Sequence, residues 1–240
     1  MGISRYRAVA ILLVRAAACV ALPESSGIEV HALTNNQIEN LAILGKVWGF
    51  LKYHHPDATT GKKNWDSELF DVMPSVLEAS GRQAADAAIL RWIGTLNPVE
   101  ACRPCVSPPH EPQLAADTKW LNDQDLLGAE LSNVLLRIYA NRILRRQWYV
   151  HIVPPGIPDF THEADYATMQ TDFGLQVLAV YRFWNAIEYW YPYRNLIPSE
   201  WDGVLRKYIA DAGLATSLRE YQRSILRLAA LIQDSHEFVS

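Results

Sequence analysis

A serine and a histidine stand side by side near the end of the chain, at Ser235 and His236. Such a pair could provide a nucleophile and a general base for acyl transfer, provided that an orienting group and an oxyanion hole meet them in space. The sequence contains no G-x-S-x-G elbow, no P-loop and no H-E-x-x-H motif that would supply this setting. From these residues alone, we interpret His236 as an exposed terminal histidine.

Two cysteines, Cys102 and Cys105, have the C-x-x-C spacing found in zinc sites and redox pairs. A structural zinc ion needs four ligands, and His110 is the nearest further candidate, so the ligand count falls short. A thioredoxin-like motif lies between a strand and a helix, whereas proline-rich loop surrounds these cysteines. A local disulfide is therefore the simplest interpretation, and we predict no metal and no cofactor.

The run His54-His55 with Asp57 could also be a metal cluster. Adjacent side chains at the end of a helix diverge by about 100°, so the two imidazoles would not face the same ion. We therefore expect these residues to pack or to stack in a loop.

Asp66 and Asp202 could be a pair of catalytic acids. Each aspartate follows a tryptophan at the start of a predicted helix, where free backbone donors and the positive end of the helix dipole favour a carboxylate. We therefore expect both carboxylates to cap helices.

These aspartates belong to a motif that occurs twice, from Leu44 to Pro56 and from Val180 to Pro192, with a Trp-Asp dipeptide after each copy. Tryptophan is a rare residue, so a constant offset of 136 residues between tryptophans indicates a duplication. At the positions of His54 and His55 the second copy has Trp190 and Tyr191, which favours packing over metal binding. The equivalent pairs are Trp48 and Trp184, Tyr53 and Tyr189, Pro56 and Pro192, Trp65 and Trp201, Asp66 and Asp202, and Leu69 and Leu205.

Apolar residues at three-to-four spacing predict helices in both copies. In the first copy we expect a helix from the capping box Thr34–Gln37 to residue 53, then helices over 65–78 after Asn64 and over 83–96. In the second copy, capping boxes at 199–202 and 217–220 should open two helices after Pro192. The last of these helices should bury the stripe Leu218, Tyr221, Ile225, Leu228 and Ile232.

The segment between the copies has prolines at both flanks, a helical pattern over 126–144 and a strand-like composition over 148–153. We therefore predict a mainly α fold with two related helical units, joined by a proline-flanked connector with a short β element. The expected parts are a signal peptide (1–22), the first helical unit (33–97), the connector (98–165), the second helical unit (166–234) and a terminal stub (235–240).

The N-terminus is typical of an export signal, with basic Arg5 and Arg7 before the apolar run 8–22, which is too short to span a membrane. Cys19 could be the lipidated residue of a degenerate lipoprotein signal. The formal net charge of −4 gives no reason to expect nucleic acid as a partner. We expect a protein of the periplasm or cell envelope.

Several stretches resemble the N-terminal region of exported serine peptidases of the tail-specific, C-terminal-processing and tricorn-like family. The stretches cover most of residues 37 to 240. They are 44–66, Tyr181-Arg-Phe-Trp-Asn185 with Tyr191-Pro-Tyr193, Trp201-Asp202, Pro158-Asp-Phe160 with Glu163 and Tyr166, and Asp234-Ser235-His236.

This resemblance implies a helical region that precedes a protease core carrying the nucleophilic serine. It assigns His236 the role of general base, with Ser235 beside it, in a site that the 240 residues leave incomplete. The expected function is the helical region of such a peptidase, inactive alone, with the core as its intramolecular partner and polypeptides as the substrates of the whole. An alternative is an exported helical module that binds peptide or glycan through aromatic loop residues.

Overall fold

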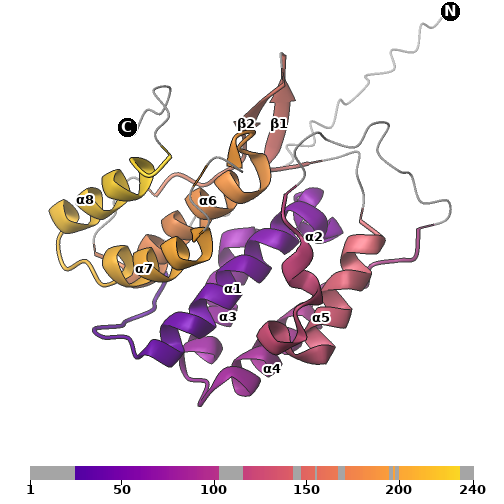
Figure 1. Cartoon of the computed structure of the whole chain (residues 1–240), viewed down its shortest axis with the longest axis horizontal. Coiled ribbons are helices and arrows are strands. Elements are labelled where there is room, and N and C mark those ends of the chain that lie inside the picture. The colour runs from indigo at the N-terminus through magenta and orange to yellow at the C-terminus, as the bar shows by residue number, and fades with distance from the viewer. Residues whose placement is uncertain are drawn as a thin grey trace, which may run out of the picture.

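The computed structural model describes residues 25–102, 116–142, 147–154, 156–166, 171–194, 197 and 200–232. The predicted mainly α class is confirmed, because helices and one small two-stranded sheet make up the regular structure of this part of the chain (Figure 1). The expected signal peptide, Cys19, Cys105, His110, Ser235 and His236 lie outside the described residues. The elements are α1 (Asn35–His54), α2 (Pro56–Thr59), α3 (Trp65–Leu77), α4 (Arg82–Ile93), the 3-10 helix η1 (Lys119–Asn122), α5 (Gln124–Ala140), β1 (Val150–Val153), β2 (Ile157–Phe160), α6 (Phe173–Trp190), α7 (Trp201–Gly213) and α8 (Leu218–Ala229).

Helix α1 is the central helix of the fold, with every residue from Asn40 to Tyr53 buried. Its start confirms the predicted capping box, because the Thr34 hydroxyl accepts the N–H of Gln37 and the Gln37 side chain accepts the N–H of Thr34. The helix ends where His55 takes an extended conformation before Pro56. A helix buried on all sides needs apolar residues around its whole circumference, as α1 has.

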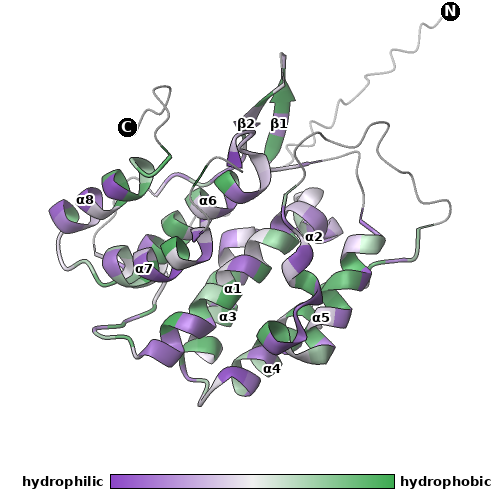
Figure 2. Cartoon of the chain, in the orientation of Figure 1, coloured by the Kyte–Doolittle hydropathy of each residue, from purple (hydrophilic) through white to green (hydrophobic). Residues whose placement is uncertain are grey.

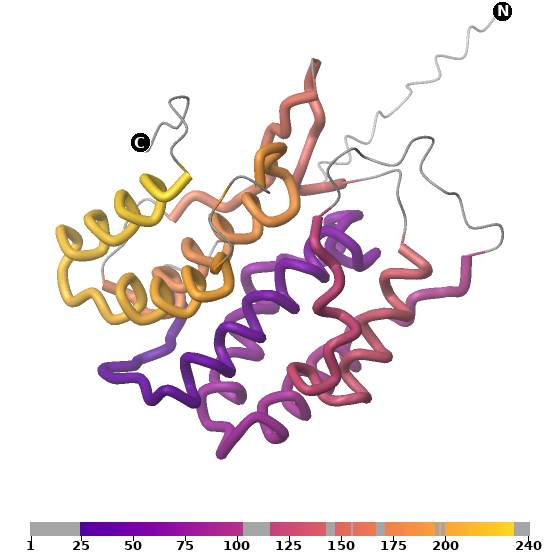
Figure 3. Tube along the Cα trace, in the orientation of Figure 1, coloured from indigo at the N-terminus to yellow at the C-terminus, as the bar shows by residue number. Residues whose placement is uncertain are grey.

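The helices of the two units coincide at the offset found in the sequence. Adding 136 to the bounds of α3, 65–77, gives 201–213, the bounds of α7, and adding 136 to those of α4, 82–93, gives 218–229, the bounds of α8. Helix α1 ends at residue 54 and α6 at residue 190, which is the same offset. This correspondence is what a duplication predicts. The three helices α1, α3 and α4 and their counterparts α6, α7 and α8 can be followed along the tube in Figure 3.

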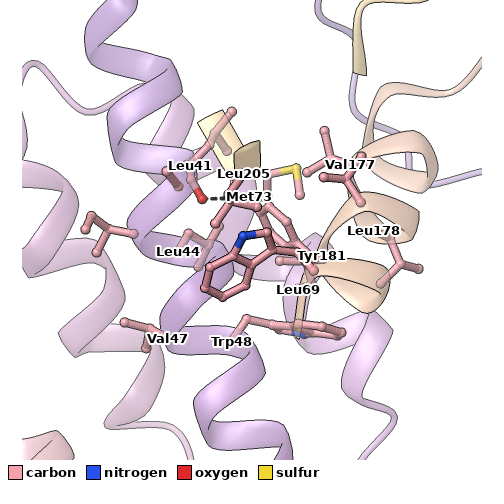
Figure 4. Packing of buried hydrophobic residues seen from close by; sticks show 14 of the residues in the cluster. Leu41, Leu44, Val47, Trp48, Leu69, Met73, Val177, Leu178, Tyr181 and Leu205 are labelled. Atoms are coloured by element: carbon pink, nitrogen blue, oxygen red, sulfur yellow. Dashed lines mark hydrogen bonds between the residues drawn. The ribbon is translucent and has the colours of Figure 1, made fainter. Parts of the chain in front are cut away.

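Equivalent residues of α1 and α6 face each other. A methyl group added to Gly45 would lie 2.6 Å from the ring of Tyr181, and one added to Gly49 would lie 1.9 Å from the side chain of Asn185. Since these contacts advance along both helices in the same direction, α1 and α6 pack in parallel. The Tyr181 hydroxyl donates to the carbonyl of Leu41 over 2.5 Å (Figure 4).

The same tryptophan contact recurs in each unit. The indole N–H of Trp48 donates to the carbonyl of Trp65 over 2.9 Å, and that of Trp184 donates to the carbonyl of Trp201 over 2.8 Å. All four rings are at most 1% exposed. One hydrophobic core therefore runs through both units, and it also takes in Leu127, Leu131 and Leu135 of α5.

Outer helices are amphipathic, and Figure 2 shows polar and apolar residues alternating around α7 and α8. In α4 the buried face consists of Ala85, Ala88, Ile89 and Trp92. The stripe predicted for α8 is wrong at Leu218, which is the first residue of the helix and is 51% exposed.

Two predicted capping boxes differ from the structure. Helix α7 begins after Glu200, which makes no side-chain cap, and Ser199 lies outside the described residues. At α8 the Ser217 hydroxyl accepts the N–H of Glu220 as predicted, but the Glu220 carboxylate accepts the N–H of Thr216 instead of that of Ser217.

The sequence predicted one strand, whereas the structure has a hairpin. Strand β1 pairs with β2 in antiparallel register, from Val150 opposite Phe160 to Val153 opposite Ile157. Strand β2 contains Pro158 and Asp159, which have low strand propensity, so its pairing depends on the neighbouring strand. Helix α5 ends at Ala140 and is kinked at Gly128, where φ is +70°.

Candidate functional site

Four charged side chains from separate elements meet at the junction of the two units. Arg182 of α6 contacts the carboxylate of Asp66 in α3 over 2.5 Å and that of Glu163, which follows β2, over 2.9 Å. The other carboxylate oxygen of Glu163 accepts from Lys52 of α1. We call Lys52, Asp66, Glu163 and Arg182 the junction cluster.

Aromatic rings enclose the Lys52 end of the junction cluster, whereas the side chains of Glu163 and Arg182 remain 23% and 20% exposed. The ammonium of Lys52 lies 4.9 Å from the ring centre of Trp48 and 4.5 Å from that of Tyr149, and the Lys52 side chain is 0% exposed. The Tyr166 hydroxyl donates to Asp66 over 3.0 Å. With two cations and two carboxylates, the cluster balances its charges internally.

Burial governs ionisation in the junction cluster. It lowers the pKa of Lys52, against the opposing attraction of Glu163, and it raises the pKa of Tyr149 to about 12. Tyr149 is therefore neutral at neutral pH and accepts the backbone N–H of Trp65 over 3.3 Å. A lysine so enclosed is placed to hold Glu163, and hence the segment after β2, against the helices.

The second unit has a corresponding but rearranged set of charges. Lys46, equivalent to Arg182, contacts Asp202, equivalent to Asp66, over 2.8 Å. At the position of Lys52 the second unit has the opposite charge, Glu188, which contacts Arg194 over 2.7 Å. Each unit therefore contributes a cation to the aspartate of the other unit.

Asp66 and Asp202 were predicted to cap helices through their carboxylates, and this prediction is wrong. Both lie in the first turn of a helix as expected. Asn64, however, accepts the backbone N–H groups at the start of α3, and both aspartates bind cations of the opposite unit. Asp66 pairs with Arg182 and Asp202 with Lys46, so the structure gives the two carboxylates separate partners.

The histidine run is used for packing, as predicted. His54 stacks on Phe50 with ring centres 4.6 Å apart and bonds its carbonyl through Nδ1, and burial lowers the pKa of His54 to about 4. The ring of His55 caps α2 by accepting the N–H of Asp57, whose carboxylate accepts two N–H groups of Asn97. Within the described ranges, no group of His, Cys, Asp or Glu side chains is arranged to hold a metal ion.

Cys102 is disulfide-bonded, in agreement with the prediction of a disulfide in place of a zinc site. The other two cysteines of the chain lie outside the described residues, so the predicted pairing with Cys105 stays a prediction. The predicted site residues Ser235 and His236 also lie outside that part of the chain, and their role stays an expectation.

A solvent-filled groove of about 480 Å³ lies at the start of α6. It is bounded by the segment 25–31, the first turn of α6 and the loop 213–216. Asp172 caps α6 here and accepts hydrogen bonds from Ser25 and Ser26. The polar groups at its centre are therefore engaged in fixing the N-terminal segment to α6.

The junction cluster was not predicted as a unit, although two signals for it were present. Lys46 and Arg182 share a charge at the offset of 136, and so do Asp66 and Asp202. Of the residues named for the family resemblance, Glu163 belongs to the junction cluster and Tyr166 donates a hydrogen bond to its Asp66. Lys52 had no signal, because a lysine at a buried helical position is atypical.

Comparisons with known proteins identified no relative of this chain. No protein-family model matches the chain, and no curated protein or solved structure matches it. Among the described helices, none combines the length and the apolar character needed to cross a membrane.

Proposed function

We propose that this chain is the helical scaffold region of an exported serine peptidase of the C-terminal-processing and tricorn-like family. The observation that supports this proposal is the convergence of the residues that carry the resemblance. Asp66, Glu163, Tyr166 and Arg182 come from three separated stretches and form one connected network. A resemblance due to chance would not be expected to select mutual contacts.

A scaffold role agrees with how these motif residues are used. The four motif tryptophans fill the core, and the charged motif residues join the connector to both units. Bonds to backbone groups also engage three of the five described histidines, namely His54, His55 and His162. In this proposal the chemistry belongs to a protease core that packs beside the helices, with His236 as general base and Ser235 next to it.

The experiment that tests the proposal is labelling with a fluorophosphonate, which reacts with activated serine nucleophiles. The purified 240-residue chain should stay unlabelled and should not cleave an unstructured peptide. Protein expressed with the codons that follow residue 240 in the genome should be labelled in that added part. Labelling within the 240 residues would overturn the scaffold assignment, and so would a longer frame that encodes no reactive serine.

The alternative is an exported module that binds peptide or glycan through the aromatic loops of the two units. The aromatic residues that precede these loops, in the last turns of α1 and α6, pack on each other, with the ring centre of Tyr53 5.4 Å from those of both Tyr189 and Trp190. Tyr193 remains 57% exposed and would be the contact residue of such a module. A single exposed ring supports this alternative less than the junction cluster supports the scaffold.

A further inference from the structure

The β1–β2 hairpin protrudes from the body of the protein (Figure 1), and one of its two faces is apolar. In the observed register Val150 lies opposite Phe160 and Ile152 opposite Pro158, and directly opposed residues share a face. Trp148 and His162 continue this face at the base, with ring centres 3.7 Å apart. The face thus carries three successive pairs without a carboxylate, lysine or arginine.

Much of this face is open to solvent. Trp148 is 41% exposed, Ile152 50% and Phe160 40%, whereas Val150 on the same face is buried in the core. The opposite face differs, because it pairs His151 with Asp159. Ile157, 57% exposed, lies on that opposite face near the turn.

The base of the hairpin is held firmly to both units. Tyr149 accepts the N–H of Trp65, and the Gln147 side chain donates to the carbonyl of Tyr53 over 2.8 Å. Glu163, which follows β2, is held by Lys52 and Arg182 of the junction cluster. A face fixed in this way is preorganised, which lowers the entropic cost of binding.

The two edges of the hairpin differ in their ability to pair with another strand. The N–H of Thr161 bonds the carbonyl of Tyr149, and alternation along an antiparallel pair then turns the backbone groups of residues 150, 152, 158 and 160 outward. On β2 the outward position 158 is a proline, which has no N–H and blocks pairing. On β1 the outward position Ile152 has both a donor and an acceptor.

From these observations we infer that the apolar face of the hairpin binds an extended, uncharged apolar segment of another polypeptide, which adds as a strand to the edge of β1. The exposed parts of Trp148, Ile152 and Phe160 amount to on the order of 300 Å², the size of a functional patch on a monomer. A stable dimer buries about 800 Å² on each partner. The area therefore favours a short peptide segment over a second copy of the chain.

The peptide contact goes beyond the scaffold role and is tested separately from it. Fluorescence anisotropy of a labelled nonapeptide of alternating valine and threonine should show saturable binding to the full 240-residue chain. The same peptide with alternate backbone amides N-methylated should bind at least tenfold more weakly, because it cannot add as a strand. Hydrogen exchange at the Ile152 amide should slow when the unmodified peptide is present.

Matched variants on the two faces of the hairpin locate the contact. Ile152→Ser should weaken binding at least tenfold, whereas Ile157→Ser, on the opposite face, should change it less than twofold. Equal losses in both variants, or no saturable binding, would overturn the inference. A concentration-dependent dimer that Ile152→Ser abolishes would also overturn it, by assigning the face to a second copy. None of these results depends on fluorophosphonate labelling, so failure of the peptide contact leaves the scaffold proposal to its own test.

Discussion

The ammonium group of Lys46 lies 2.8 Å from the carboxylate of Asp202, and the pair repeats, at an offset of 136 residues in both members, the contact of Arg182 with Asp66. The two contacts cross between the units in opposite directions. Such a reciprocal exchange of partners is expected if the two units arose by duplication. The units are therefore joined by reciprocal ion pairs as well as by the packing of α1 on α6.

The two equivalent aspartates should differ in their contribution to stability. Asp66 is 6% exposed and Asp202 is 50% exposed, measured on the side chain. Asp66→Asn should lower the free energy of unfolding by about 3 kcal/mol, because it removes the more buried of the two carboxylates that pair with Arg182. Asp202→Asn should lower the free energy of unfolding by less than about 1 kcal/mol, because an ion pair with a half-exposed carboxylate contributes little to stability. Urea denaturation followed by tryptophan fluorescence measures both, and equal losses would contradict the junction cluster.

Trp184 should be among the most sensitive core positions, because its ring is 1% exposed and stacks on Trp201 with centres 6.1 Å apart. Trp184→Ala should lower the free energy of unfolding by about 3–5 kcal/mol. The control Tyr193→Ala, at a 57% exposed ring, should cost less than about 1 kcal/mol. A loss well under 1 kcal/mol for Trp184→Ala would place that ring outside the core.

Two glycines in helices should respond to alanine in opposite ways. A methyl group on Gly49 would lie 1.9 Å from the Asn185 side chain, so Gly49→Ala should cost about 2 kcal/mol by forcing α1 away from α6. In α7, the nearest atom to a methyl group on Gly203 is 3.8 Å away. Gly203→Ala should therefore stabilise by about 0.5–1 kcal/mol through helix propensity. If chemical denaturation shows Gly49→Ala to be neutral, the parallel contact of α1 with α6 is wrong.

Asp86 should make stability depend on pH. Burial between α4 and the kink of α5 raises the pKa of Asp86 from 3.8 to about 6, although Arg82 opposes the shift. The folded state therefore disfavours the ionised carboxylate. Its contribution to stability is fully present below pH 3.8 and is lost as pH rises to about 6.

Replacing Asp86 by asparagine removes this pH-dependent loss. Asp86→Asn should raise the free energy of unfolding at pH 7 by about 1 kcal/mol, a value reduced for partial exposure, and should give a smaller gain near pH 4. Thermal unfolding across this pH range measures the difference. Asp71→Asn, at an exposed position of α3, serves as the control. A gain that does not depend on pH would show that Asp86 does not titrate as proposed.

Local features of the fold could be predicted from the sequence, because short-range chemistry determines them. Thr34 with Gln37, and Asn64 before Trp65, act at helix starts through neighbouring backbone groups. Strand β2 could not be predicted from its own composition, since Pro158 and Asp159 pair only because β1 is adjacent.

The partners of buried charges were harder to predict than helix starts. Asp66 was expected to cap α3, but Asn64, two residues earlier, takes that place and leaves the carboxylate for Arg182, 116 residues away in the chain. Glu163 meets Lys52 only after the connector folds back on both units. Such partners are set by tertiary packing and could be found from sequence only by treating the equivalent charges of the two copies together.

The scaffold claim is tested most directly by fluorophosphonate labelling of two purified proteins, the 240-residue chain and the same chain expressed with the codons that follow it. We predict no label on the first protein and label on a serine of the added part of the second. Label on any serine among the 240 residues, or a longer protein without a reactive serine, would contradict the account.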